Sequence, residues 1–126
     1  MARIRTIKPS FWSSGTVAKL GFEARLLAVG LISMADDDGR FLCTTAAVMG
    51  HVFPNDEELP KVKVRRWLDQ IRTSGMVHEY EVDGIRYGVF PEWHEHQVIN
   101  RYTPSHLPEP DVSCSPRCPK RKGVDQ

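Results

Sequence analysis

The sequence predicts a mainly α-helical domain that carries a small antiparallel β-hairpin, and three observations lead to this fold class. Residues 60–75 place apolar side chains at i, i+3, i+4 and i+7, the spacing of one helical stripe: Val64, Trp67, Leu68 and Ile71. Residues 76–90 then alternate between apolar and polar side chains around Asp83-Gly84, a strong two-residue hairpin signal. Residues 22–35 are apolar over so wide an arc, which includes Phe22 and Leu26, that they predict the longest and most central helix.

The helix predicted at 60–75 is well bounded and strongly basic. Pro60 suits its first position, and Gly75 suits the left-handed residue that ends a helix. Its five basic residues accompany a single acid, Asp69, although the whole chain has a formal net charge of only +1: Lys61, Lys63, Arg65, Arg66 and Arg72. The side opposite the apolar stripe points outward: Val62, Arg66, Asp69 and Thr73. A solvated surface balanced by neighbouring charges is the alternative interpretation of this helix.

The other elements of the domain precede the basic helix. Residues 44–53 predict a short helix with threonine caps, and the turn-rich residues 54–58 separate it from the basic helix. Residues 40–43 predict a short strand that would pair with the hairpin. Residues 36–39, Asp-Asp-Asp-Gly, end the central helix in a turn. The three aspartates suggest a cation site, but the EF-hand spacing is absent, so turn chemistry explains them better.

Residues 1–20 are predicted to form an N-terminal arm followed by a short helix. We expect Phe11 and Trp12 to pack onto the domain, because a pair of exposed aromatic side chains is costly in water. The alternative is a basic arm that contacts nucleic acid, and we retain it for Arg3 and Arg5.

Residues 1–105 are predicted to form the domain, and residues 106–126 a proline-rich, basic and disordered tail. Cys114 and Cys118 could bind zinc together with a histidine such as His106, but structural zinc sites use a tighter pair and a second pair downstream. Free thiols are the preferred interpretation, since three cysteines are too few for a disulfide framework.

The chain carries no signature of an enzyme. It has no glycine-rich phosphate loop, no nucleophile with a recognisable partner, and no H-E-x-x-H pair, since His94 and His96 are only two residues apart. No run approaches the roughly 20 apolar residues of a membrane span, and the N-terminus lacks a signal-peptide core. We therefore expect an intracellular, non-enzymatic protein with no metal, cofactor or membrane partner.

The predicted order of helix, turn, basic helix and hairpin is that of a winged helix-turn-helix, in which the second helix enters the major groove of DNA. The sequence thus predicts sequence-specific binding to double-stranded DNA. The candidates for contacts to base edges are Lys63, Arg66, Gln70 and Thr73. The candidates for contacts to phosphate are Lys61, Arg65, Arg72, Arg86, Arg3 and Arg5.

An interaction module that binds a protein instead of DNA is the alternative function. Glu79, Glu81 and Asp83 would repel a phosphate backbone where the hairpin of a winged helix normally touches it. Only Arg86 would compensate for them.

Six segments together resemble the N-terminal winged-helix domain of phage and prophage replication initiators, or replisome organisers, DnaD-like in a loose sense, and of related helix-turn-helix DNA-binding proteins. They span about residues 3–108 and read R-T-I-K-P-S-F-W, F-E-A-R-L-L-A-V-G-L-I-S-M-A-D-D-D-G-R, V-F-P-N-D, V-R-R-W-L-D-Q-I, Y-x-V-D-G-x-R-Y and W-H-E-H-Q-V-I-N-R-Y-T-P-S-H-L-P. The resemblance implies a phage-encoded protein of the bacterial cytoplasm that acts in replication initiation or transcription control. A homodimer partner and phage or host replication proteins are compatible with that role.

Overall fold

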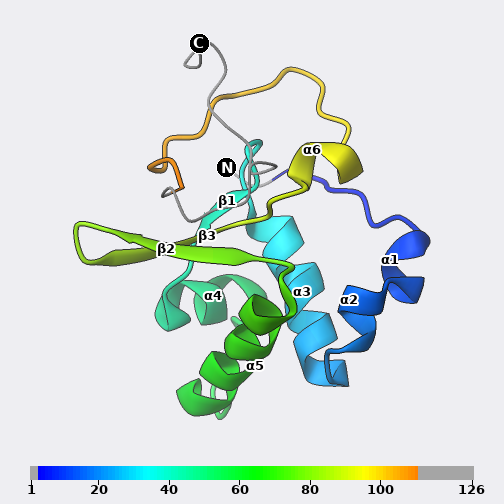
Figure 1. Cartoon of the computed structure of the whole chain (residues 1–126). Helices are drawn as coiled ribbons and strands as arrows, with labels where there is room; N and C mark the ends of the chain where they lie inside the picture. Colours follow the sequence, from blue (N-terminus) through cyan, green and yellow to red (C-terminus); the bar gives the residue numbers. More distant parts are fainter. Residues whose placement is uncertain (1–2, 111–126) are drawn as a thin grey trace.

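The computed structural model describes residues 3–110 of the 126-residue chain. This part forms six helices and a three-stranded antiparallel sheet, which is compatible with the predicted mainly α fold (Figure 1). The elements in chain order are α1 (Ser10–Ser13), α2 (Gly15–Ala18), α3 (Phe22–Met34), β1 (Arg40–Leu42), α4 (Thr45–Val52), α5 (Lys61–Ser74), β2 (His78–Val82), β3 (Ile85–Val89) and α6 (Trp93–His96).

The sheet has the strand order β1-β3-β2, so β3 lies between the strand that precedes α4 and the strand that follows α5. The predicted hairpin is confirmed at its turn, where Asp83 and Gly84 have the positive φ angles of 54° and 78° that such a two-residue turn requires. Pairing of Arg40 with Val89 confirms that the strand predicted at 40–43 joins the hairpin. β2 begins two residues later than the alternating pattern, and Val77 is buried in the core before the strand starts.

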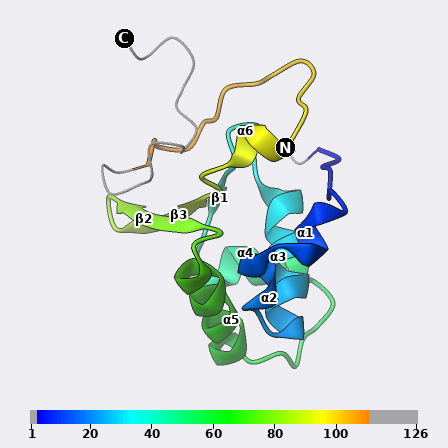
Figure 2. The same cartoon turned by 45° about the vertical axis from the view of Figure 1, so that its right-hand side comes forward.

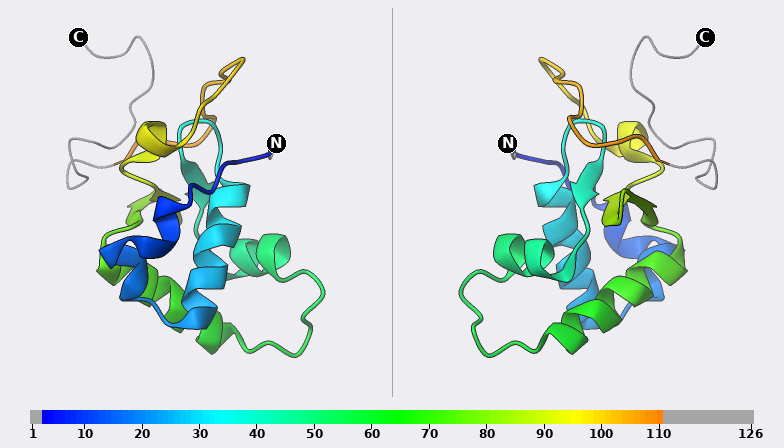
Figure 3. Two further views of the ribbon diagram at one scale, coloured as in Figure 1. Left: turned by 90° about the vertical axis from the view of Figure 1, so that its right-hand side faces the viewer. Right: turned by 90° about the vertical axis from the view of Figure 1, so that its left-hand side faces the viewer.

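Helix α3 lies at the centre of the fold, with α1 and α2 on one side and α4 on the other (Figures 2 and 3). Its buried side consists of Ala24, Leu27, Ala28, Leu31 and Ile32, which pack toward α4 and α5. The apolar arc that predicted a central helix is buried only in part, since the exposed fractions of Phe22 and Leu26 are 80% and 62%. Ala24 and Ala28 are small, so the neighbouring elements can approach α3 closely on the side that carries these alanines. Phe22 and Leu26 lie on the opposite side of the helix.

The N-terminal segment is folded against the domain. Ser14 caps α2, because its hydroxyl accepts a hydrogen bond from the N–H of Thr16. Phe11 packs against the core as expected, whereas the same expectation for Trp12 is wrong, since Trp12 is 59% exposed. Trp12 instead meets the Phe11 ring edge to face, with 4.8 Å between ring centroids.

The three adjacent aspartates form the predicted turn and also a buried cluster of carboxylates. Asp36 accepts hydrogen bonds from the N–H groups of Asp38 and Arg40, at 2.9 and 3.0 Å, as an aspartate in a turn does. Asp37 and Asp38 are only 3% and 1% exposed. Asp38 accepts from the Tyr102 hydroxyl at 2.7 Å, so the cluster ties the C-terminal segment to the end of α3.

The chain stays in contact with the sheet beyond residue 105, the expected end of the domain, through Leu107 and Pro108 (Figure 1). The Arg40 guanidinium donates to the carbonyl of Leu107 at 3.0 Å, and the Tyr80 hydroxyl donates to the carbonyl of Pro108 at 2.7 Å. The remainder of the predicted tail, including Cys114 and Cys118, lies outside the described residues.

Candidate nucleic-acid interface

Helix α5 carries the candidate interface, and its inner side fixes its orientation. The predicted apolar stripe is confirmed at Val64, Leu68 and Ile71, which are each no more than 2% exposed, while Trp67 is partly buried against the core. Gly75 ends the helix in the left-handed conformation, with φ 89°, as predicted. Pro60 is the N-cap and not the first helical residue, so the helix begins one residue later than expected.

The outer side of α5 presents unpaired positive charge. Lys61, Lys63 and Arg66 are exposed, and none of them forms an ion pair with any other residue in the range 3–110. Arg72 is half-exposed and lies 3.8 Å from Asp69. The candidate positions Lys61, Lys63, Arg66, Arg72 and Thr73 therefore remain accessible to a partner.

Arg65, predicted to contact phosphate, instead links α5 to the hairpin. Its guanidinium lies 2.8 Å from the Asp69 carboxylate and 2.9 Å from that of Glu79. Burial by itself lowers the pKa of Arg65, but these two carboxylates outweigh burial and raise the pKa above its ordinary value. A phosphate would have to displace both carboxylates, so we withdraw Arg65 from the set of phosphate contacts.

Gln70, predicted to read a base, is also engaged inside the molecule. Its side-chain oxygen accepts a hydrogen bond from the N–H of Gly21, the N-cap of α3, at 3.2 Å. An amide that reads adenine needs both its oxygen and its nitrogen free, and the oxygen is already used. We therefore withdraw Gln70 as a candidate for base contact.

Arg3 and Arg5 form ion pairs with Asp37 and do not form a free basic arm. Arg5 is only 5% exposed, and its guanidinium lies 3.0 Å from the Asp37 carboxylate and donates to the carbonyl of Ala35 at 2.9 Å. Arg3 lies 3.2 Å from Asp37 and also donates to the carbonyl of Asn100. The assignment of these two arginines to phosphate contact is therefore incompatible with their positions, and we withdraw it.

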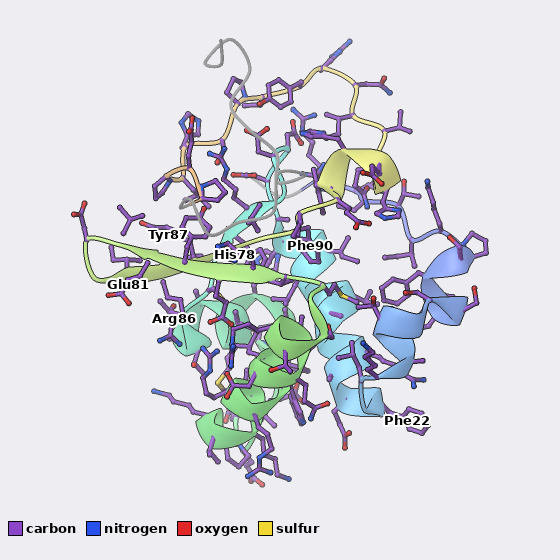
Figure 4. All side chains as sticks on the ribbon, viewed as in Figure 1. Phe22, His78, Glu81, Arg86, Tyr87 and Phe90 are labelled. Atoms are coloured by element: carbon purple, nitrogen blue, oxygen red, sulfur yellow. The ribbon has the colours of Figure 1, made fainter. Side chains whose placement is uncertain are left out.

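The hairpin beside α5 is less acidic toward a partner than its sequence suggests. Glu79 is only 10% exposed and lies between Arg65 and Arg86, at 2.9 and 3.9 Å. Its charge is thus compensated within the molecule. Glu81 remains exposed, and so does Asp83 at the turn, while half-exposed Arg86 supplies a cation on the same strand pair (Figure 4).

Val62 is a further candidate site residue, to which the sequence assigns no contact with DNA. It is 63% exposed and lies one helical turn before Arg66, on the same outward side of α5. Its outward direction is visible in the helical spacing, but an uncharged residue gives no further signal. In a protein–DNA interface an exposed aliphatic side chain can contact the methyl group of thymine.

Three further findings concern the buried cysteine, metal ligands and helix length in the described part of the chain. Burial, followed by the charge of Glu79, raises the pKa of the Cys43 thiol to about 12, so this cysteine is not a thiolate at neutral pH. Within residues 3–110, no group of three or more potential ligands is placed to hold a metal ion. No helix in that range is both long and apolar enough to cross a bilayer.

No protein-family model, curated protein or solved structure matches the chain. The resemblance to phage winged-helix proteins therefore remains an expectation from the sequence.

Proposed function

We propose that this chain binds double-stranded DNA as a winged helix-turn-helix protein, with α5 in the major groove. The unpaired cationic side of α5, next to the β2–β3 hairpin, is the observation that carries the proposal. In this arrangement α4 and α5 form the helix-turn-helix and the hairpin is the wing. DNA is the favoured anion because a helix of this width fits the major groove of the duplex.

The accessible residues divide into two groups. Lys63, Arg66 and Thr73, joined by Val62, would face base edges, and Arg66 suits the O6 and N7 atoms of guanine. The residues proposed to hold phosphates are Lys61, Arg72 and Arg86. The biological setting suggested by the sequence resemblance is phage replication initiation or transcription control.

Selection of bound duplexes from a random-sequence library tests the proposed function. We expect enrichment of a short consensus that contains guanine, since the exposed Arg66 side chain is able to make a bidentate base contact. If the library DNA binds but no consensus sequence is enriched, the result would contradict sequence-specific binding. A chain that retains no duplex at about 50 mM salt, where phosphate contacts are strong, would overturn DNA binding altogether.

Lys61→Ala is expected to weaken binding to every duplex alike. A phosphate contact carries no sequence information, so specific and scrambled duplexes should lose the same factor. The slope of log K against log salt should become shallower by about 0.9, the value for one lost phosphate contact. Fluorescence anisotropy at several salt concentrations measures both quantities, and a loss confined to the specific duplex would assign Lys61 to base reading.

Val62→Ala is expected to abolish a preference for thymine at one position of the selected site. Replacing that thymine by deoxyuridine removes only the methyl group and should weaken wild-type binding about fourfold, the value of one buried methylene-sized group. The same replacement should leave the affinity of Val62→Ala unchanged. If every thymine-to-deoxyuridine change acts equally on both proteins, Val62 does not read a methyl group.

A protein-binding module remains the second candidate function because Glu81 and Asp83 stay exposed on the hairpin. If the hairpin serves a protein partner, these acids would meet no phosphate and would not oppose binding. A heparin column distinguishes the two functions, since a DNA-binding chain should be retained and released only by added salt. Elution in the void volume, with no shift of genomic fragments in a gel, would favour the protein-binding module.

A further inference from the structure

One side of α3 lies opposite its buried side and is largely apolar. Four residues at i, i+4, i+7 and i+11 follow one another along this side, which we name the α3 stripe: Phe22, Leu26, Val29 and Ser33. Phe22 and Leu26 are the two most exposed apolar residues of the helix, at 80% and 62%. Phe22 lies at the outer end of α3, away from the body of the domain (Figure 4).

A groove lies beside the later part of the α3 stripe, between α3 and the segment that joins α4 to α5. Its volume is about 960 Å³. Its apolar lining comes from Leu26, Val29, Val52, Phe53, Leu59 and Trp67. Its rim carries three exposed acids, Asp56, Glu57 and Glu58, none of which forms an ion pair with another described residue.

The other end of the stripe carries two cations against one exposed acid, Glu23. The Arg25 guanidinium, which also donates to the carbonyls of Leu20 and Ala18, lies over the Phe22 ring at 5.2 Å from its centroid. Exposed Lys19 precedes α3 by three residues. An aromatic knob with basic neighbours thus lies on the same side of α3 as an apolar groove with an acidic rim. From Phe22 to Val29 the distance along the helix is about 10 Å, at 1.5 Å per residue.

We propose that this surface binds a second copy of the chain, with the two α3 helices antiparallel about a twofold axis. Phe22 of each copy would enter the groove of its partner, and Arg25 and Lys19 would meet the partner's acids at positions 56–58. A twofold contact requires one surface that is complementary to itself, and a knob and a groove displaced along one helix meet this requirement. Phe22 cannot fill the groove of its own chain, because both features belong to the same rigid helix.

Charge decides between a second copy and other occupants of the groove. An acidic rim repels an acidic segment and attracts an aromatic residue that has basic neighbours. The chain itself offers that combination at Phe22, and it is placed at the correct end of the same stripe. The proposal is independent of DNA binding, because no residue of the α3 stripe belongs to the cationic side of α5.

Sedimentation velocity of the full chain without DNA, over a range of concentrations, tests the proposal. We expect a reversible dimer in the wild-type chain. Phe22→Glu is expected to raise the dissociation constant at least about 30-fold, as for a residue that dominates an interface. Leu26→Glu should act in the same direction, and both variants should melt at the wild-type monomer temperature because both residues are exposed.

Val62→Glu is the matched control, since Val62 is as exposed as Leu26 but lies on α5. It should leave the dimer intact. Arg25→Glu should weaken the dimer, because it places an acid opposite the acidic rim of the partner's groove. Adding Glu57→Lys and Glu58→Lys should restore the dimer, because the rim then carries the charge opposite to that at position 25. A wild-type chain that stays monomeric at all concentrations overturns the proposal and leaves the groove to a different partner. A dimer that persists in Phe22→Glu also overturns it.

Discussion

Asp37→Ala is expected to lower the free energy of unfolding by about 3 to 5 kcal/mol, the cost of removing one partner from a buried ion pair. The Arg5 guanidinium would remain 5% exposed without its carboxylate, which lies 3.0 Å away in the wild-type chain. The N–H of Thr103 would lose its acceptor as well, because it donates to Asp37 at 2.9 Å. Chemical denaturation followed by circular dichroism measures the change.

Asp56→Ala is the matched control for this variant, since Asp56 is an exposed acid in a loop. It should change stability by no more than about 0.5 kcal/mol. A double variant that also carries Arg5→Ala should recover part of the loss, because no buried charge then lacks its partner. An Asp37→Ala chain as stable as Asp56→Ala would show that the ion pair contributes nothing to the fold.

The same carboxylate predicts how stability depends on pH. Burial raises the pKa of Asp37, but the hydrogen bond from Thr103 and the two nearby arginines outweigh burial and bring the pKa below 3.8. A folded-state pKa below the unfolded value means that the stabilisation is fully present above about pH 4 and is lost on further acidification. We expect this acid-dependent loss to be smaller in Asp37→Asn, as denaturation curves between pH 2 and about 6 would show.

Arg66→Ala is expected to weaken binding to the selected duplex by about 1 to 3 kcal/mol and to relax discrimination at one guanine. Arg66 is exposed in the first half of α5 and has no ion pair within the described residues, so it loses no internal contact on substitution. The free energy of unfolding of the Arg66→Ala variant should therefore stay near that of the wild-type chain. Anisotropy against the selected and scrambled duplexes separates loss of base reading from loss of charge.

Arg101→Asn is the control for Arg66→Ala. Arg101 is an exposed cation in the segment that follows α6, which lies at the opposite end of the molecule from α5 (Figure 1). Its φ of 59° is one that asparagine adopts readily. Its substitution should change the affinity for the selected duplex very little. Equal losses on selected and scrambled duplexes for Arg66→Ala would remove Arg66 from base reading and leave it as a phosphate contact.

Local signals explain why α5 and the hairpin could be predicted from the sequence. The stripe of Val64, Leu68 and Ile71 has one clear helical spacing, and Gly75 supplies the left-handed residue after it. The Asp83-Gly84 pair fixes both the turn and the register of the hairpin. These features depend on residues close in sequence, so spacing and turn chemistry were sufficient to find them.

The inner side of α3 could not be chosen from its own residues. Apolar side chains surround most of the helix, so Leu26 and Leu27 look equally suited to the core. Contacts with α4 and α5 decide that Leu27 is buried and Leu26 is not. The sequence carries no local mark of these tertiary contacts.

The withdrawn members of the candidate site failed for a related reason. Arg5 meets Asp37, Arg65 meets Glu79 and Gln70 meets Gly21, over separations of 32, 14 and 49 residues. Each is a polar residue of a type common in DNA interfaces, and each forms a hydrogen bond or ion pair with a residue distant in the sequence. Residue type and helical position identify the outward side of α5, but only the tertiary structure shows which side chains remain free.

Amide chemical shifts of the ¹⁵N-labelled full chain during titration with the selected duplex test the central claim, that the cationic side of α5 binds DNA. We predict the largest changes in residues 61–73 and in the hairpin turn around Asp83-Gly84. The α3 stripe, on another side of the molecule, should change little. Changes confined to α3 and residues 53–59, with α5 unaffected at saturating duplex, would contradict the account.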